Sequence, residues 1–260
     1  MNSNMSPDSD GGSGTDRQPD GRADPIQIAI VLYPGFTALD AVGPYEVLRN
    51  LPDVDLRFVA HEPGPIVTDA GILVMAATHS FAETPSPDIV LVPGSEAETV
   101  TAMADGPLIE WLQRVHQTSR YTVSVCSGTL ILAAAGILRG RAATTHWIAQ
   151  DRLKGFGVEA RRNERIVRSG KVITAAGVSA GVDLGLHLAT ELAGTERAQI
   201  IQLIIEYDPQ PPHDSGHPSK ASPAVFEAAR SEMLERIQNR RNLVSVPKVL
   251  WREMLQRLRR

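Results

Sequence analysis

Cysteine is almost absent from this 260-residue sequence, which holds a single one, Cys126. One cysteine excludes an intrachain disulfide and is typical of proteins kept in a reducing compartment. No apolar run reaches the roughly 18 residues that a membrane-spanning helix needs, so no membrane partner is expected. The net charge of −4 gives no general attraction for nucleic acid. We therefore expect a cytoplasmic protein that acts on something other than nucleic acid or lipid.

The two ends of the chain differ from its body. Residues 1–25 are rich in Gly, Ser, Asp and Pro and lack the apolar core of a signal peptide, so we expect a disordered tail. Residues 26–240 carry the apolar runs of one large domain. Residues 241–260 are basic with an apolar stripe, and we expect a helix or tail there, with an acidic partner as the alternative to packing on the body.

Short apolar runs alternate with helical patterns through the body of the chain. Buried strands are expected over residues 26–33, 54–60, 88–92, 121–125 and 172–175. Helices are expected over 39–50, 107–118, 129–135, 181–192 and 224–238, and a small hairpin over 61–73. The Gly43-Pro44 pair is expected to break the first helix early. This alternation predicts an α/β fold with a doubly wound, mostly parallel sheet flanked by helices.

Cys126 stands where the 121–125 strand runs into a helical stretch. A sharp strand-to-helix turn displays its side chain at the carboxyl edge of the sheet, as a nucleophile elbow does. The positive end of the helix dipole at that point favours a thiolate. A buried structural thiol is the alternative, because free cysteine is among the most buried residue types.

A nucleophilic cysteine needs a proton-transfer partner. No histidine follows Cys126 directly, which excludes an adjacent Cys-His pair; His146 is the distant candidate, and a structural role is its alternative. Asp40 follows the first strand at the same edge, among apolar neighbours that raise the pKa of a carboxyl. The alternative for Asp40 is a helix N-cap.

Developing negative charge needs hydrogen-bond donors. The turn that ends the 88–92 strand contains Gly94 and Ser95, and their backbone N–H groups, with that of Ser127, could form an oxyanion hole. An ordinary turn is the alternative.

Two further patterns suggest binding but are explained without a ligand. The segment that begins at Gly177 is glycine-rich, yet it lacks the lysine of a phosphate-binding loop and predicts a tight turn near the pocket. His213 and His217 lie among prolines that forbid the regular helix a metal pair needs. We therefore expect neither a metal nor a cofactor.

Together these residues resemble the ThiJ/PfpI superfamily, which has the class I glutamine amidotransferase-like, flavodoxin-like fold. The motifs are Leu39-Asp40 with Gly43-Pro44, Val92-Pro93-Gly94, Ser124-Val125-Cys126-Ser127-Gly128, and Ala175-Ala176-Gly177 through Ala180-Gly181-Val182-Asp183. Within the superfamily the isonitrile hydratases are most similar, through PGPIV (63–67), GILRGRAATTHW (136–147), ERIVRSG (164–170) and IEYDPQPP (205–212). The resemblance covers residues 26–241.

The resemblance implies specific roles. Cys126 would be the nucleophile, Asp40 the catalytic carboxyl, and Ser127 the neighbouring hydroxyl where the hydratases have threonine. The implied reaction hydrates an isocyanide to an N-substituted formamide through a cysteine thioimidate, in a homodimer with the site near the interface. Ser95 stands where the family often has glycine, which predicts a different or strained turn.

Two other functions remain open. Another thiol-dependent enzyme of the superfamily would rely on a glutamate near the cysteine or a histidine after it, and the matching positions hold neither. A small-molecule or redox sensor would need only a low-pKa cysteine. Related transcriptional regulators carry a helix-turn-helix domain after the shared core, and the roughly 20 residues beyond Arg240 are too few for one, which favours an enzyme.

Overall fold

The computed structural model describes residues 24–237 and 247–249 of the chain. The tail expected over 1–25 and the basic segment expected over 241–260 lie almost entirely outside these ranges. Within them, no helix combines the length and apolar character needed to cross a membrane.

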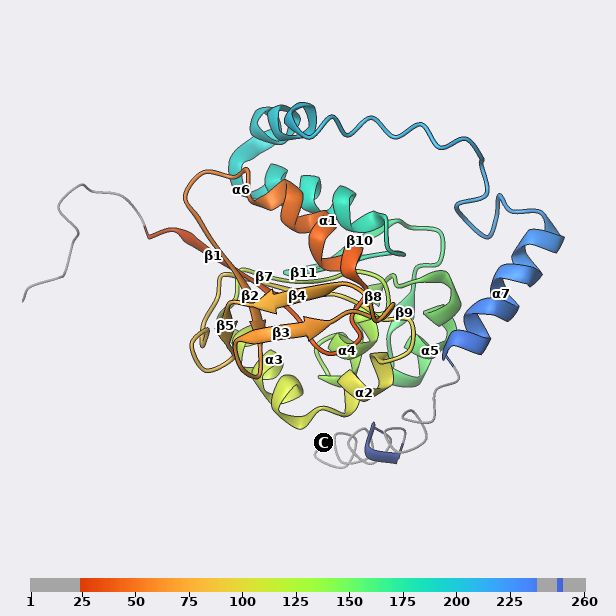
Figure 1. The fold of residues 1–260 in the computed structure, drawn as a ribbon, viewed down its shortest axis with the longest axis horizontal. Helices are drawn as coiled ribbons and strands as arrows, with labels where there is room; N and C mark the ends of the chain where they lie inside the picture. Colours follow the sequence, from red (N-terminus) through yellow and green to blue (C-terminus); the bar gives the residue numbers. More distant parts are fainter. Residues whose placement is uncertain (1–23, 238–246, 250–260) are drawn as a thin grey trace, which may run out of the picture.

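A seven-stranded sheet with the order β10-β11-β7-β6-β1-β2-β5 lies at the centre of the protein (Figure 1). Its strands, in chain order, are β1 (Ile26–Val31), β2 (Val54–Ala60), β5 (His79–Ser80), β6 (Ile89–Val92), β7 (Tyr121–Ser124), β10 (Ile166–Ser169) and β11 (Val172–Ala175). All neighbouring strands are parallel except β10, which is antiparallel to β11. The predicted doubly wound, mostly parallel sheet is therefore confirmed.

Helices cover both faces of this sheet (Figure 1). On one face lie α1 (Ala38–Leu48) and α6 (Ala180–Ile204), and on the other α2 (Thr99–Ala104), α3 (Gly106–Thr118) and α4 (Gly128–Ala134). Because side chains on both faces are covered, the central strands β6, β7 and β11 are buried along their whole length. This is why β6 reads as a continuous apolar run rather than as an alternating pattern, while β7 and β11 also bury Thr122, Ser124 and Thr174.

The break expected in the first helix is wrong, because α1 continues through Pro44. The adjacent helix α6 approaches α1 very closely: a Cβ at Gly181 would lie 3.1 Å from the Pro44 ring, and one at Gly185 would lie 2.8 Å from Val47. The missing side chains let the two helices pack tightly, and this tertiary contact holds a helix that the local sequence disfavours.

Two other expected boundaries differ from the structure. The helix expected over 181–192 extends to Ile204, with a break at Gly194, where φ is +85°. The hairpin consists of β3 (Gly64–Val67) and β4 (Val74–Ala77), so its second strand lies beyond the expected 61–73.

The remaining elements lie outside the central sheet and the five helices that cover it. They are β8 (Ala142–Ala143), η1 (Trp147–Ala149), α5 (Gln150–Leu153), η2 (Lys154–Phe156), β9 (Glu159–Ala160) and α7 (Pro223–Ile237). Helix α7 has no buried residue and is the surface helix expected from the sequence. Residues 205–222, which contain no helix or strand, lead across the molecule from α6 to α7 (Figure 1).

Candidate active site

Cys126 sits in a strained turn at the carboxyl end of β7. Its φ is +57°, in the left-handed region that non-glycine residues rarely adopt, at a cost of about 1–3 kcal/mol. Its N–H donates to the Ala176 carbonyl at 2.7 Å, and its carbonyl accepts from the Thr145 hydroxyl at 2.7 Å. A Cβ at Gly128 would lie 2.2 Å from the Val92 carbonyl oxygen, so only glycine lets α4 start this close to β6. The elbow geometry expected from the sequence is present.

Asp40 lies behind the elbow, in the first turn of α1. The N-cap of this helix is Thr37, so the N-cap interpretation of Asp40 is wrong. The Asp40 side chain is completely buried, and its Oδ2 accepts the Gly94 N–H at 2.8 Å. Burial raises its pKa to about 7, although the Gly94 bond and the Cys126 thiol both act to lower it. The raised pKa expected from the apolar surroundings is thus confirmed.

The second carboxylate oxygen, Asp40 Oδ1, is also buried and has no well-formed hydrogen bond within the described part of the chain. A buried oxygen without a partner is costly for a carboxylate and much less costly for a neutral carboxyl group. Oδ1 is therefore the atom on which a proton is best accommodated.

The thiolate expected at Cys126 is not favoured in this structure. Burial and the nearby charge of Asp40 raise the pKa of the thiol well above its usual value, and the hydrogen bonds from Ser127 only partly oppose them. The helix α4 that was expected to stabilise the thiolate is only seven residues long. Burial is the largest of these causes, so the resting pair carries a neutral thiol beside a carboxyl that titrates near neutral pH.

The turn after β6 packs directly on both groups. A Cβ at Gly94 would lie 2.6 Å from Ser127 N and 3.0 Å from Asp40 Oδ2, so no other residue fits between them. Its own N–H binds Asp40, and the Ser95 N–H donates to Ser127 Oγ at 2.9 Å. The backbone donors considered for an oxyanion hole are therefore engaged by site side chains in this structure.

The strained backbone predicted at Ser95, where the family often has glycine, is not present. Its φ lies outside the left-handed region. Its hydroxyl donates to the Gly35 carbonyl at 2.5 Å and accepts the Glu98 N–H at 2.9 Å. The serine side chain thus ties two turns together at the start of α2.

The hydroxyl of Ser127 is held by three bonds. It accepts from the Ser95 N–H, donates to the Ser95 carbonyl at 3.0 Å, and forms a hydrogen bond with the Thr99 hydroxyl at 2.7 Å. These bonds fix the position of the residue that follows Cys126.

His146 and Gly177 lie next to each other. A Cβ at Gly177 would be 2.8 Å from His146 Cδ2, so glycine leaves space for the imidazole ring. His146 lines the same pocket as Cys126, and its Nδ1 accepts the Ile148 N–H at 3.4 Å. Burial lowers its pKa to about 4, so the ring is neutral at physiological pH.

A pocket of about 110 Å³ opens above the elbow. Its polar lining includes the charged Glu96 and Arg152 together with Ser95, Thr99, Cys126, Ser127 and His146, and its apolar lining includes Val100, Leu130, Ile148, Val178, Met233 and Ile237. Asp40, Gly94 and Gly177 are not in its lining; Asp40 lies directly behind Cys126, in side-chain contact with the thiol at the floor of the pocket. The pocket has room for a small, mostly apolar molecule with one reactive end.

Several residues of this site were missed at the sequence level. Thr99 and Thr145 hold Ser127 and Cys126, and the negative charge of Asp69 raises the pKa of Asp40. Thr145 lies in the ATTHW string and could have been identified from it. Met233 and Ile237 come from a distant surface helix, and no local pattern links them to the pocket.

Comparison with known proteins agrees with this geometry. The DJ-1/PfpI family model matches residues 26–191. The isonitrile hydratase of Pseudomonas putida is 40% identical over 205 residues, which cover 79% of this chain and 89% of the hydratase.

Solved structures give the same result. A ThiJ/PfpI family protein from Pseudomonas syringae superimposes with a TM-score of 0.79 at 33% identity, covering 91% of this chain and 97% of that one. Drosophila melanogaster DJ-1beta superimposes with a TM-score of 0.64 at 20% identity, covering 71% of this chain and all of that one, and shares the fold. The chain belongs to the DJ-1/PfpI family.

Proposed function

We propose that this protein is a hydratase that converts an isocyanide, R–N≡C, to the N-substituted formamide, R–NH–CHO. The observation that carries the proposal is the Cys126 thiol beside the buried Asp40 carboxyl, whose pKa is about 7, at one end of a small pocket. The 40% identity to an isonitrile hydratase over most of both chains supports a hydratase-like activity.

The first half of the reaction forms a thioimidate. Asp40 accepts the thiol proton on Oδ1 as the Cys126 sulfur bonds to the terminal isocyanide carbon. That carbon becomes basic as it is attacked, and Asp40 returns the proton to it. The product of this half is R–N=CH–S–Cys126, and Asp40 is again a carboxylate. A carboxyl with a pKa near the working pH can serve in both directions.

The second half releases the formamide. Asp40 accepts a proton from a water molecule as the water oxygen bonds to the thioimidate carbon, and passes this proton to the nitrogen, which gives R–NH–CH(OH)–S–Cys126. The carbon–sulfur bond then breaks as Asp40 moves the hydroxyl proton to the sulfur, and R–NH–CHO leaves. The overall change is the addition of one water to one isocyanide, with no external oxidant or reductant.

The other residues of the site position this pair. Ser127, locked by Ser95 and Thr99, keeps the residue after the nucleophile in place, and its N–H contacts the Cys126 sulfur. The neutral His146 ring offers a polar wall without a competing charge.

A redox-sensor function fits this geometry less well. A sensing cysteine needs thiolate character and access to solvent. Cys126 is 6% exposed, and its pKa is raised rather than lowered.

The test is an assay of the purified protein with one aliphatic and one aromatic isocyanide, following formamide by mass spectrometry, with Cys126→Ala alongside. We expect turnover that is abolished in the variant. Turnover that survives in Cys126→Ala, or no turnover with either compound, would contradict the proposal. The homodimer that the family resemblance implies is a separate prediction, tested by light scattering.

A further inference from the structure

The apolar side of the pocket includes side chains that the sequence places more than 100 residues from the nucleophile. Met233 and Ile237 on α7 line the same cavity as Cys126. They are four residues apart, so one turn of helix brings both to the same face. Both are half-buried, while Cys126 is buried, which places α7 toward the mouth of the pocket and the sulfur at its floor.

Helix α7 is held at this mouth by surface contacts. Arg236 Nη1 pairs with Glu96 Oε1 at 3.0 Å, and the Phe226 ring lies 5.4 Å, centroid to centroid, from that of Trp147. No residue of α7 is buried, and the preceding segment, residues 205–222, has no regular structure. Truncating a side chain on the inner face of α7 therefore changes the pocket wall without creating a cavity in the protein core.

The chemistry of the proposed substrate makes this wall important. An isocyanide group is linear, so once its terminal carbon reaches the Cys126 sulfur, the R substituent extends straight away from the floor. In a pocket of about 110 Å³ the substituent must meet a wall. An unbranched, flexible methionine beside an isoleucine forms an apolar boundary that adapts to shape but limits size.

We infer that Met233 and Ile237 are specificity-determining residues that set the size of the group that can stand above the Cys126 sulfur. As applied to the R substituent of an isocyanide, this rests on the proposed function. As a statement about the space above the sulfur, it stands on the pocket geometry alone.

The first experiment measures kcat/KM for methyl and cyclohexyl isocyanide in the wild type, Met233→Ala and Ile237→Ala. The cyclohexyl-to-methyl ratio is expected to rise about tenfold or more in each variant, because a single methylene in an apolar pocket already changes selectivity by that order. Leu234→Ala is the matched control: it is on the same helix, is half-buried and does not line the pocket. An unchanged ratio in both variants, or an equal rise in the control, would overturn the inference.

The second experiment separates this inference from the proposed function. Cys126 is the only cysteine, so thiol-directed reagents report on one atom. We expect benzyl methanethiosulfonate to gain reaction rate relative to methyl methanethiosulfonate in Met233→Ala and Ile237→Ala, and not in Leu234→Ala. If the wild type hydrates no isocyanide but the benzyl-to-methyl labelling ratio rises in the two variants, the proposed function is wrong and the inference that Met233 and Ile237 limit the space above the sulfur is supported. If the benzyl-to-methyl labelling ratio does not change in either variant, the inference about Met233 and Ile237 is refuted, whether or not the protein hydrates isocyanides.

Discussion

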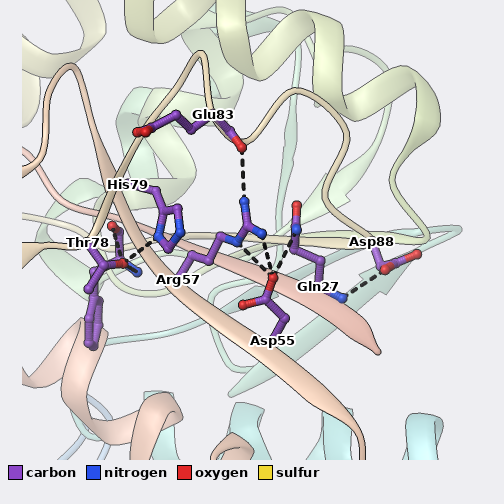
Figure 2. A network of polar contacts seen from close by, with 8 residues as sticks. Gln27, Asp55, Arg57, Thr78, His79, Glu83 and Asp88 are labelled. Carbon is purple, nitrogen blue, oxygen red and sulfur yellow. Dashed lines mark hydrogen bonds and ion pairs between the residues drawn. The ribbon is translucent and has the colours of Figure 1, made fainter. Parts of the chain in front are cut away.

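Two groups of polar side chains near the central sheet shift the pKa of a carboxyl in opposite directions. At the carboxyl ends of the strands, Asp40 and Cys126 are buried together, and burial is the largest cause that raises the pKa of each. Beside β2 lies a polar cluster of Gln27, Asp55, Arg57, Thr78, His79, Glu83 and Asp88 (Figure 2). Its central charges are paired and reach solvent.

The polar cluster beside β2 is satisfied throughout. Arg57 bonds Asp55 Oδ2 through Nε at 2.8 Å and the Glu83 carbonyl through Nη1 at 2.9 Å, and Gln27 donates to Asp55 at 3.1 Å (Figure 2). Burial acts to raise the pKa of Asp55, but the bonds from Arg57 and Gln27 lower it overall. The difference shows that burial dominates the pKa of Asp40, whereas at Asp55 the hydrogen bonds and the charge of Arg57 together outweigh burial.

The largest effect is expected for the substitution Asp40→Asn. The amide keeps an oxygen for the Gly94 N–H but cannot carry a proton between thiol and substrate. We expect kcat to fall by about 100- to 10,000-fold, the usual contribution of general acid–base catalysis. Steady-state kinetics with an isocyanide measures it. A fall of less than tenfold would show that Asp40 is not the proton carrier.

The same variant and its counterpart Asp55→Asn should change the pH dependence of stability in opposite directions. The folded state raises the pKa of Asp40 from 3.8 to about 7, so its ionisation opposes folding. Wild type should lose about 4 kcal/mol of unfolding free energy relative to Asp40→Asn as pH rises from about 4 through about 7.

Asp55 has a lowered pKa, so its ion pair stabilises the fold above pH 3.8 and the contribution is lost as pH falls through the folded pKa. Urea unfolding at several pH values compares the two variants with wild type. For each variant, the difference in unfolding free energy from wild type is plotted against pH. If this difference changed with pH in the same direction for both variants, the comparison would be contradicted.

A smaller effect concerns the backbone at the elbow. Glycine adopts a φ of +57° without strain, and alanine does not. Cys126→Gly should therefore be more stable than Cys126→Ala by about 1 kcal/mol, although glycine normally destabilises relative to alanine. Thermal or urea unfolding of both inactive variants gives the difference. A more stable alanine variant would mean that the turn relaxes once the sulfur is gone.

The smallest effect is expected at Arg57. The Arg57 and Asp55 side chains are 20% and 33% exposed, and pairs of this kind contribute less than about 1 kcal/mol. Arg57→Ala should lower stability by that amount, less so at high salt, and leave kcat/KM within about twofold of wild type. A large loss of activity would connect the two regions and undo their separation.

The sequence predicted the sheet and the positions of Cys126 and Asp40 because both depend on local signals. Buried strands read as apolar runs, and the turns after β1, β6 and β7 begin at recognisable residues, so their meeting at one edge follows from the fold class. The strained φ at Cys126 likewise follows from a strand that turns sharply into a helix.

What the sequence could not give depends on distances between remote segments. The raised pKa of Cys126 comes from burial and from Asp40, which together outweigh the hydrogen bonds from the neighbouring Ser127. The bond from the Ser95 N–H to Ser127, and the approach of α7 to the pocket, join segments that are 32 and more than 100 residues apart. Pro44 stays helical only because α6 presents Gly181 and Gly185 to it and to Val47.

The strained turn at Cys126 also bears on how this sequence tolerates change. A domain of this kind is stable by only about 5–15 kcal/mol, and the turn holds about 1–3 kcal/mol of unfavourable backbone energy. Typical substitutions lower the free energy of unfolding by about 1 kcal/mol each. The strain at residue 126 therefore reduces the number of substitutions that the rest of the chain tolerates before it unfolds. A descendant in which glycine replaced this cysteine would lose the thiol and, in the same step, tolerate more destabilising substitutions elsewhere. The rate at which the whole sequence can diverge therefore depends on the residue at position 126.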